Sequence, residues 1–128
     1  MGYYLKTSCN ECGYTKNFRL GHGRFDHLME RILPQLEKND ALEIEKLQKN
    51  NTLDFVLFDI ALAYCSNCNE LFEVPIASIF LKNGQTIKNI KCPSCKKDIT
   101  IVDETEEKIL CPKCGNSSLI CEELGLWD

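Results

Sequence analysis

The chain has 128 residues, of which 9 are cysteines, and a formal net charge of −4. A chain of this length forms one domain or two very small ones, and very small units need metal or disulfides because their apolar core is limited. The N-terminal residues lack the apolar stretch of a secretory signal, and the longest apolar run, residues 55–64, is too short to cross a bilayer, so we expect a cytoplasmic protein with reduced thiols and no membrane segment.

The first motif along the chain is the C-x-x-C pair Cys9/Cys12, which a short β run over 15–20 and the turn Gly21-His22-Gly23 follow. Apolar residues then recur at intervals of three and four, which predicts an amphipathic helix. Asp26 is placed to cap this helix, and Pro34 should end it near residue 33. The apolar stripe consists of Phe25, Leu28, Met29, Ile32 and Leu36.

A second helix is predicted because Asp40 followed by Glu43 resembles a capping box. This helix should run through about residue 49 and stop at Asn50-Asn51. Residues 54–64 then read as a β-strand that leads into the second pair, Cys65/Cys68.

The segment 71–81 is apolar and extended, although Pro75 favours an edge position or a break. Asn83-Gly84 is a strong hairpin signal between this segment and a run over 86–90. We place a domain boundary at this turn, with one continuous sheet as the alternative.

The last two pairs, Cys92/Cys95 and Cys111/Cys114, enclose fifteen residues. These residues predict a hairpin in which runs over 99–102 and 108–110 flank a charged turn at 103–107. A strand-like stretch over 118–121 follows the last pair.

The four pairs predict metal sites because each supplies two thiolates at the spacing that tetrahedral Zn²⁺ prefers. Gly or Asn follows the second cysteine in three pairs, as Gly13, Asn69 and Gly115, where a sharp turn tolerates a left-handed conformation. Lys96 is the exception. We predict two structural Zn²⁺ ions per chain, with ligands Cys9, Cys12, Cys65, Cys68, Cys92, Cys95, Cys111 and Cys114.

Four pairs can be partnered in three ways. The fifteen-residue spacing favours Cys92/Cys95 with Cys111/Cys114, which leaves Cys9/Cys12 with Cys65/Cys68. The predicted fold is therefore a small metal-bound α+β protein with two four-cysteine zinc ribbons and short antiparallel β-hairpins. Residues 1–83 form the first ribbon with a helical insertion at about 24–50, and residues 84–128 form the second.

The knuckles Cys92-Pro-Ser-Cys95 and Cys111-Pro-Lys-Cys114-Gly115 resemble those of the zinc-ribbon, or rubredoxin-like, superfamily over about residues 90–120. The first half is similar to small uncharacterised bacterial two-zinc-ribbon proteins. That similarity rests on the outline formed by Cys9 to Gly13, Gly21-His22-Gly23, the helix from Arg24 and Cys65/Cys68. The resemblance implies an architecture and brings no established activity with it.

The leading functional hypothesis is a non-catalytic adaptor that binds a protein partner. It rests on the apolar stripe of the helical insertion and on the C-terminal segment 124–128, in which Trp127 is an exposed anchor or a lid on the second ribbon. For the stripe, packing on the protein's own sheet is the more probable use.

Nucleic-acid binding is the alternative, because the N-terminal region interleaves cations with aromatic rings. The cations are Lys6, Lys16, Arg19 and Arg24, and the rings are Tyr3, Tyr4, Tyr14 and Phe18. Counting eight thiolates and two Zn²⁺ ions makes the net charge more negative still, which weakens this hypothesis. A thiol-based redox or metal sensor is a further alternative, since oxidation would release zinc.

An enzyme is not expected, because a catalytic zinc needs three protein ligands and an open position. The spare candidates are His22, His27 and Cys121. His22 reads as a turn residue, His27 as a solvated helix residue and Cys121 as a buried thiol.

Overall fold

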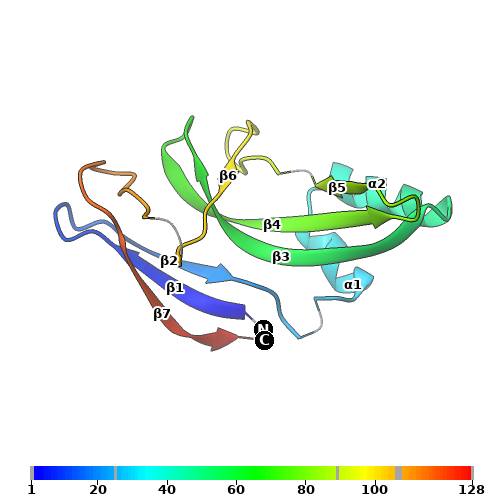
Figure 1. Ribbon diagram of the computed structural model, residues 1–128, viewed down its shortest axis with the longest axis horizontal. Coiled ribbons are helices and arrows are strands. Elements are labelled where there is room, and N and C mark those ends of the chain that lie inside the picture. The colour runs from blue at the N-terminus through cyan, green and yellow to red at the C-terminus, as the bar shows by residue number, and fades with distance from the viewer. Residues whose placement is uncertain (1, 25, 89, 106–107, 128) are drawn as a thin grey trace.

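The computed structural model describes residues 2–24, 26–88, 90–105 and 108–127. These residues form a small β-rich fold with two antiparallel sheets and two α-helices (Figure 1). Sheet A has the strand order β2-β1-β7, and sheet B has the order β5-β4-β3-β6. Five residues of predicted elements lie outside the described residues. They are Phe25 of the predicted apolar stripe, Asn89 of the run over 86–90, Glu106 and Glu107 of the charged turn, and Asp128 of the C-terminal segment.

Sheet A joins the two ends of the chain. Its central strand is β1 (Gly2–Ser8), which pairs with β2 (Thr15–Leu20) on one side and with β7 (Ile120–Trp127) on the other. Gly2 lies opposite Trp127, so the termini are adjacent in Figure 1. The run expected over 15–20 is confirmed, whereas β1 and most of β7 were not predicted.

Sheet B is a long hairpin with two short flanking strands. The hairpin consists of β3 (Leu53–Cys65) and β4 (Glu70–Leu81). The flanking strand β5 (Thr86–Lys88) pairs with β4, and β6 (Thr100–Ile101) pairs with β3. The expected strands over 54–64 and 71–81 are confirmed, and Gly84 makes the predicted turn with φ +90°.

Pro75 lies inside the continuous strand β4, so the expected break is wrong, whereas the expected edge position is found locally because β5 does not reach this residue. Pro75 faces Ile60 of β3. The N–H and C=O of Ile60 both bond to Gly21, at 2.8 Å each, and so point away from β4. Because this pair exchanges no bond across the hairpin and β5 pairs only with residues 78–80, the missing N–H of proline costs no ladder bond.

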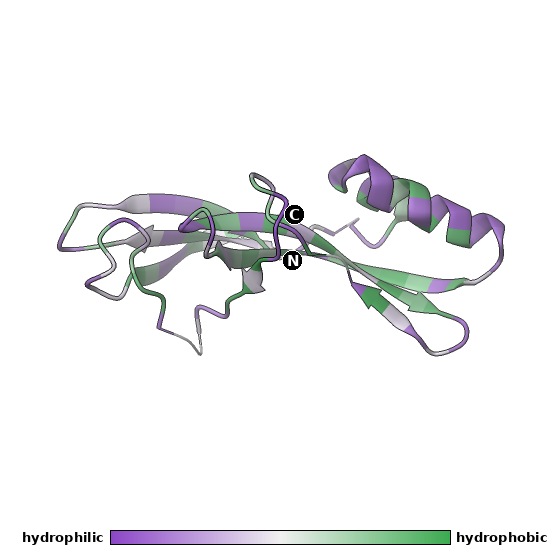
Figure 2. Ribbon diagram, turned by 90° about the horizontal axis from the view of Figure 1, so that it is seen from above, coloured by the Kyte–Doolittle hydropathy of each residue, from purple (hydrophilic) through white to green (hydrophobic). Residues whose placement is uncertain are grey.

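The helical segment lies between β2 and β3 and packs on one face of sheet B (Figure 2). It contains α1 (Met29–Ile32), the 3₁₀ turn η1 (Leu33–Gln35) and α2 (Lys38–Lys49). The fully buried Ile32 and Ile44 form a core cluster with side chains of β3 and β4. Most of the predicted stripe therefore serves internal packing.

The helix starts differ from the predicted caps. The Asp26 carboxylate accepts a bond from the Gly23 N–H at 2.6 Å instead of capping a helix, and α1 begins only after Leu28. α2 begins after Glu37, ahead of the predicted capping box at Asp40, and the Glu37 side chain at its N-cap makes no capping bond to the helix backbone. Packing of the apolar face fixes these short helices more than capping does.

The hairpin predicted between residues 99–102 and 108–110 is wrong. β6 pairs with Ala63 and Tyr64 of β3, and Leu110 instead bridges Ser118. A two-residue strand is stabilised more by pairing with the long free edge of β3 than by pairing with another short run.

Candidate metal centres

Two groups of four cysteines lie where turns of the chain meet. The first, here called the outer cluster, contains Cys9, Cys12, Cys111 and Cys114. Its first pair lies in the turn between β1 and β2, and its second pair precedes β7, so the blue and orange tips meet in Figure 1. The outer cluster thus joins the beginning and the end of the chain.

The second group, here called the inner cluster, contains Cys65, Cys68, Cys92 and Cys95. Its first pair lies at the tip of the β3–β4 hairpin, and its second pair precedes β6 (Figure 1). The inner cluster therefore lies wholly within the stretch of chain that the outer cluster encloses.

The sulfur positions fit a tetrahedral metal ion. Within each cluster the sulfurs lie within 4.8 Å of one another. In the outer cluster the Sγ–Sγ distances are 3.7 Å for Cys9–Cys114 and 3.5 Å for Cys12–Cys111. In the inner cluster they are 3.6 Å for Cys65–Cys95 and 3.8 Å for Cys68–Cys92. A metal–sulfur bond of about 2.3 Å in a tetrahedron gives an edge of about 3.8 Å, far from the roughly 2.05 Å of a disulfide.

All four turns share one backbone conformation. The residue after the second cysteine has a positive φ in every pair, at 76° for Gly13, 52° for Asn69, 64° for Lys96 and 68° for Gly115. At Gly13, Lys96 and Gly115 its N–H bonds to the carbonyl of the first cysteine, at 2.8–3.1 Å. The predicted left-handed turn is confirmed, and it includes Lys96 although lysine disfavours this region.

The sulfurs of one cluster cannot all ionise without a cation. In the inner cluster, a backbone N–H of Lys97 stabilises the Cys95 thiolate and lowers its pKa to about 6. The hydrogen bond with Cys95, together with burial, raises the pKa of Cys68 to about 12. Four thiolates this close repel one another, so a bound cation is what allows full deprotonation.

In the outer cluster, too, the pKa of one cysteine is lowered while that of another is raised. Burial disfavours the Cys111 thiolate, but backbone N–H groups of Cys114 and Lys113 outweigh it and lower the pKa to about 7. At Cys12 a backbone bond from Tyr14 favours the thiolate, yet burial and the neighbouring sulfurs prevail and raise the pKa to about 11. Both clusters are therefore sites that could hold a metal ion.

The predicted partnering of the pairs is wrong. Cys9/Cys12 lies with Cys111/Cys114, and Cys65/Cys68 lies with Cys92/Cys95. Each cluster takes one pair from residues 1–83 and one from 84–128, and the division of the chain at that point stays a prediction. The pairs that flank the helices belong to different clusters, so the helices are not an insertion within one four-cysteine site.

A side chain that sequence reasoning missed connects the two clusters. Asn69, next to the candidate ligand Cys68, donates from Nδ2 to the carbonyl of Pro112 at 2.7 Å, and Pro112 follows Cys111. The Tyr64 hydroxyl bonds to Oδ1 of the same amide at 2.5 Å. Asn69 was noted only for its turn conformation, and its sequence position carries no sign of this contact.

The spare ligand candidates join neither cluster. His22 faces Asp59, with 3.6 Å between Nδ1 and Oδ1, and Nδ1 of His27 lies 3.2 Å from the carbonyl of Arg24. Cys121 lies in β7 opposite Thr7, and burial together with Glu104 raises the pKa of its thiol. Among the described residues, the two clusters are the only groups of three or more candidate ligands close enough to share an ion.

The cations and rings proposed for nucleic acid are spread over several environments. Lys16 makes an ion pair with Glu70 and donates to the carbonyl of Leu71 at 2.9 Å. Arg19 lies 3.8 Å over the ring of Trp127. Lys6 and Tyr4 are exposed on β1, whereas the ring of Phe18 is buried in the core.

Trp127 is a lid on sheet A and not an exposed anchor. Its side chain is 8% exposed. The indole Nε1–H points at two carbonyls, of Leu20 at 3.0 Å and of Tyr3 at 3.2 Å. The ring lies over Gly2, where a Cβ atom would come within 2.0 Å of it.

Comparisons with protein families, with curated proteins and with solved structures find no match to this chain. Among the described residues, no helix is long and apolar enough to cross a membrane.

Proposed function

We propose that the chain is a non-catalytic zinc-binding protein in which two structural Zn²⁺ ions hold a surface that binds a protein partner. The observation that carries the zinc assignment is the all-sulfur composition of both clusters at tetrahedral spacing. Four thiolates suit Zn²⁺ and leave no position for water or substrate. This closed ligand set supports a structural role and a likeness to zinc ribbons.

Metal analysis of protein purified without added metal tests this assignment. We expect two zinc atoms per chain and no visible absorption. Iron in the same ligand set would give a coloured protein and would contradict the assignment, because four-sulfur tetrahedral sites also accept iron. A content of one zinc would restrict the proposal to one cluster.

The partner surface is proposed on the face of sheet B that the helices leave open. Alternation along β3 turns Val56 and Phe58 toward the helices, so Phe55 and Leu57 face the other side. Close to the inner cluster, the segment that includes Ile90, Ile99 and Ile101 covers this second face. Farther along the hairpin, none of the described residues covers it.

The open part of this face has the composition of a protein interface. Phe55 is 46% and Leu57 58% exposed. The ring of Phe55 stacks on Phe80 of β4 with 4.4 Å between centroids and an interplanar angle of 14°. An exposed aromatic ring stacked on a half-buried one, beside an exposed aliphatic side chain on a rigid sheet, supplies apolar contact at little entropic cost.

A photo-crosslinking amino acid at position 57 tests the surface in living cells. We expect a discrete adduct with another protein, which the additional substitution Phe55→Ser removes. Position 42 is the matched control, because Leu42 is 52% exposed but lies on α2, on the other side of the sheet. The same adducts at both positions, or none at position 57, would contradict the proposal, and an adduct of twice the chain mass would identify a second copy instead.

Nucleic-acid binding and thiol-based sensing stay predictions with tests of their own. Phosphate contacts would make affinity fall steeply between low and moderate salt, and the absence of binding at low salt would exclude them. A sensor would release zinc at oxidant concentrations below those that damage ordinary structural sites.

A further inference from the structure

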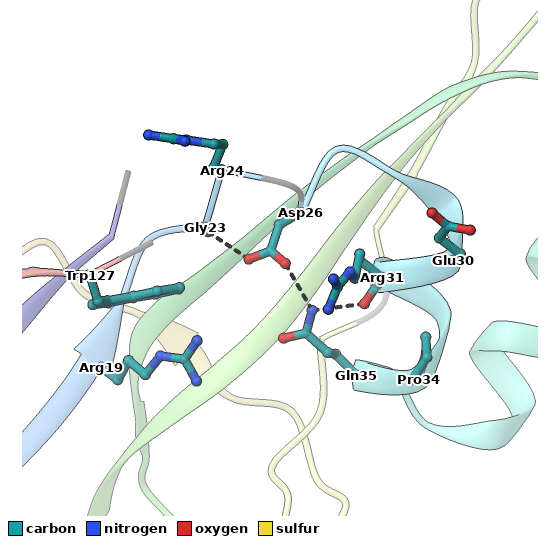
Figure 3. A pocket seen from close by; sticks show the side chains of 9 residues that line it. All are labelled: Arg19, Gly23, Arg24, Asp26, Glu30, Arg31, Pro34, Gln35 and Trp127. Carbon is teal, nitrogen blue, oxygen red and sulfur yellow. Dashed lines mark hydrogen bonds between the residues drawn. The ribbon is translucent and has the colours of Figure 1, made fainter.

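A pocket of about 470 Å³ lies where the end of sheet A meets the helical segment (Figure 3). β2 contributes Arg19, β7 contributes Trp127, and the turn before α1 contributes Gly23, Arg24 and Asp26. The remaining lining residues come from α1 and η1 and are Glu30, Arg31, Pro34 and Gln35. This volume lies in the range of small-molecule sites.

One wall of the pocket is a fixed cation on an aromatic base. The Arg19 guanidinium lies 3.8 Å over the ring of Trp127, and two carbonyls hold that indole in place. Stacking occupies one face of a guanidinium and leaves its N–H groups, which lie in the guanidinium plane, free to bind an oxyanion. Arg19 is therefore oriented before any ligand arrives.

The carboxylate nearest the middle of the pocket is already engaged. Asp26 accepts one bond from the Gly23 N–H at 2.6 Å and one from Gln35 Nε2 at 3.3 Å. Figure 3 shows Glu30 at the side of the pocket away from Trp127 and Arg19. Among the described residues, no carboxylate makes an ion pair with Arg19 or Arg31.

We propose that this pocket binds the phosphate group of a small phosphorylated molecule. Guanidinium groups pair bidentately with phosphate oxygens, and Arg19 and Arg31 approach the pocket from two different elements. The volume exceeds that of a phosphate ion, so the pocket holds part of the group that the phosphate is attached to. Because six of the nine lining residues carry polar or charged side chains, a sugar-like group fits better than a wholly apolar one.

Fluorescence of the single tryptophan gives a direct test, because Trp127 is part of the lining. The probe is ribose 5-phosphate at low salt, with ribose, inorganic phosphate and succinate as comparisons. We expect saturable changes with ribose 5-phosphate and none with ribose. Comparable affinity for inorganic phosphate would support the same site, with free phosphate as the ligand in place of a phosphorylated molecule. No saturation with either phosphate, or equal binding of succinate, would overturn the proposal.

Substitution of Arg31→Gln locates the site without touching Trp127. We expect affinity for ribose 5-phosphate to fall about tenfold or more, since bonds to a charged group are lost. Lys46→Gln is the matched control, because it removes one positive charge from the exposed side of α2, outside the pocket. Equal affinity in both variants, each with an unchanged melting temperature, would overturn the assignment.

Discussion

The outer and inner clusters are built on one plan from very different lengths of chain. In each, a hairpin carries the first cysteine pair at its tip, and the second pair precedes a strand that pairs with the first strand of that hairpin. The inner cluster closes across residues 69–91 and is completed by the two-residue β6. The outer cluster closes across residues 13–110 and is completed by the eight-residue β7.

The cluster with the longer closure therefore also has the longer completing strand. Loop-closure entropy rises slowly with loop length, and the additional ladder bonds of β7 offset it. The two sheets also share a core, because Leu62 and Leu71 of sheet B pack with Leu5 and Phe18 of sheet A. Since the inner cluster closes across the shorter stretch of chain, we expect sheet B to form first and to be the platform on which sheet A and the outer cluster assemble.

The largest expected effect comes from single substitutions of a buried candidate ligand. One variant is made in the inner cluster and another in the outer cluster. Cys92→Ser in the inner cluster should abolish both metal sites. The inner site loses an apparent metal-binding free energy of about 10–16 kcal/mol, and the outer site loses the platform on which it assembles. Cys111→Ser, equally buried in the outer cluster, should leave one bound metal and an intact sheet B. Native mass spectrometry and circular dichroism measure both outcomes. One retained metal in Cys92→Ser would show that the clusters assemble independently.

An intermediate effect is expected from Asn69→Gly. Glycine accepts the φ of 52° at this position but loses the bond to the carbonyl of Pro112, so the free energy of unfolding should fall by about 1 kcal/mol. We also expect a chelator titration to separate into two metal-release steps. A single step at the wild-type midpoint would exclude Asn69 as a link between the clusters.

The smallest effect, of opposite sign, is expected from Lys96→Gly at the corresponding turn position. Glycine relieves the strain of a φ of 64°, at the cost of an exposed ion pair with Glu37 at 2.7 Å. The ion pair is exposed and contributes little, so the net result should be a small rise in melting temperature. A lower melting temperature would mean that the contact with Glu37 matters more than the backbone strain.

The cysteine spacing and the turn residues were enough to predict the candidate ligands, and the apolar runs were enough to predict the strands over 54–64 and 71–81. The partnering was not predictable from spacing, because a favourable short loop between Cys95 and Cys111 competes with strand pairing between distant segments. The long strand β7 decides this competition in favour of pairing between distant segments. In the sequence, only the strand-like stretch over 118–121 indicated this strand. The pocket was missed because Arg31 has the position of an ordinary solvated helix residue.

The nested order of the clusters has a consequence for synthesis on the ribosome. Cys9 and Cys12 emerge first but receive their partner sulfurs only after 98 further residues, 13–110, have been made. At roughly 5–20 residues per second, this pair stays half-complete for roughly 5–20 seconds. The inner pairs can meet within that interval, so we expect the proposed metal ions to bind a newly made chain from its middle outward.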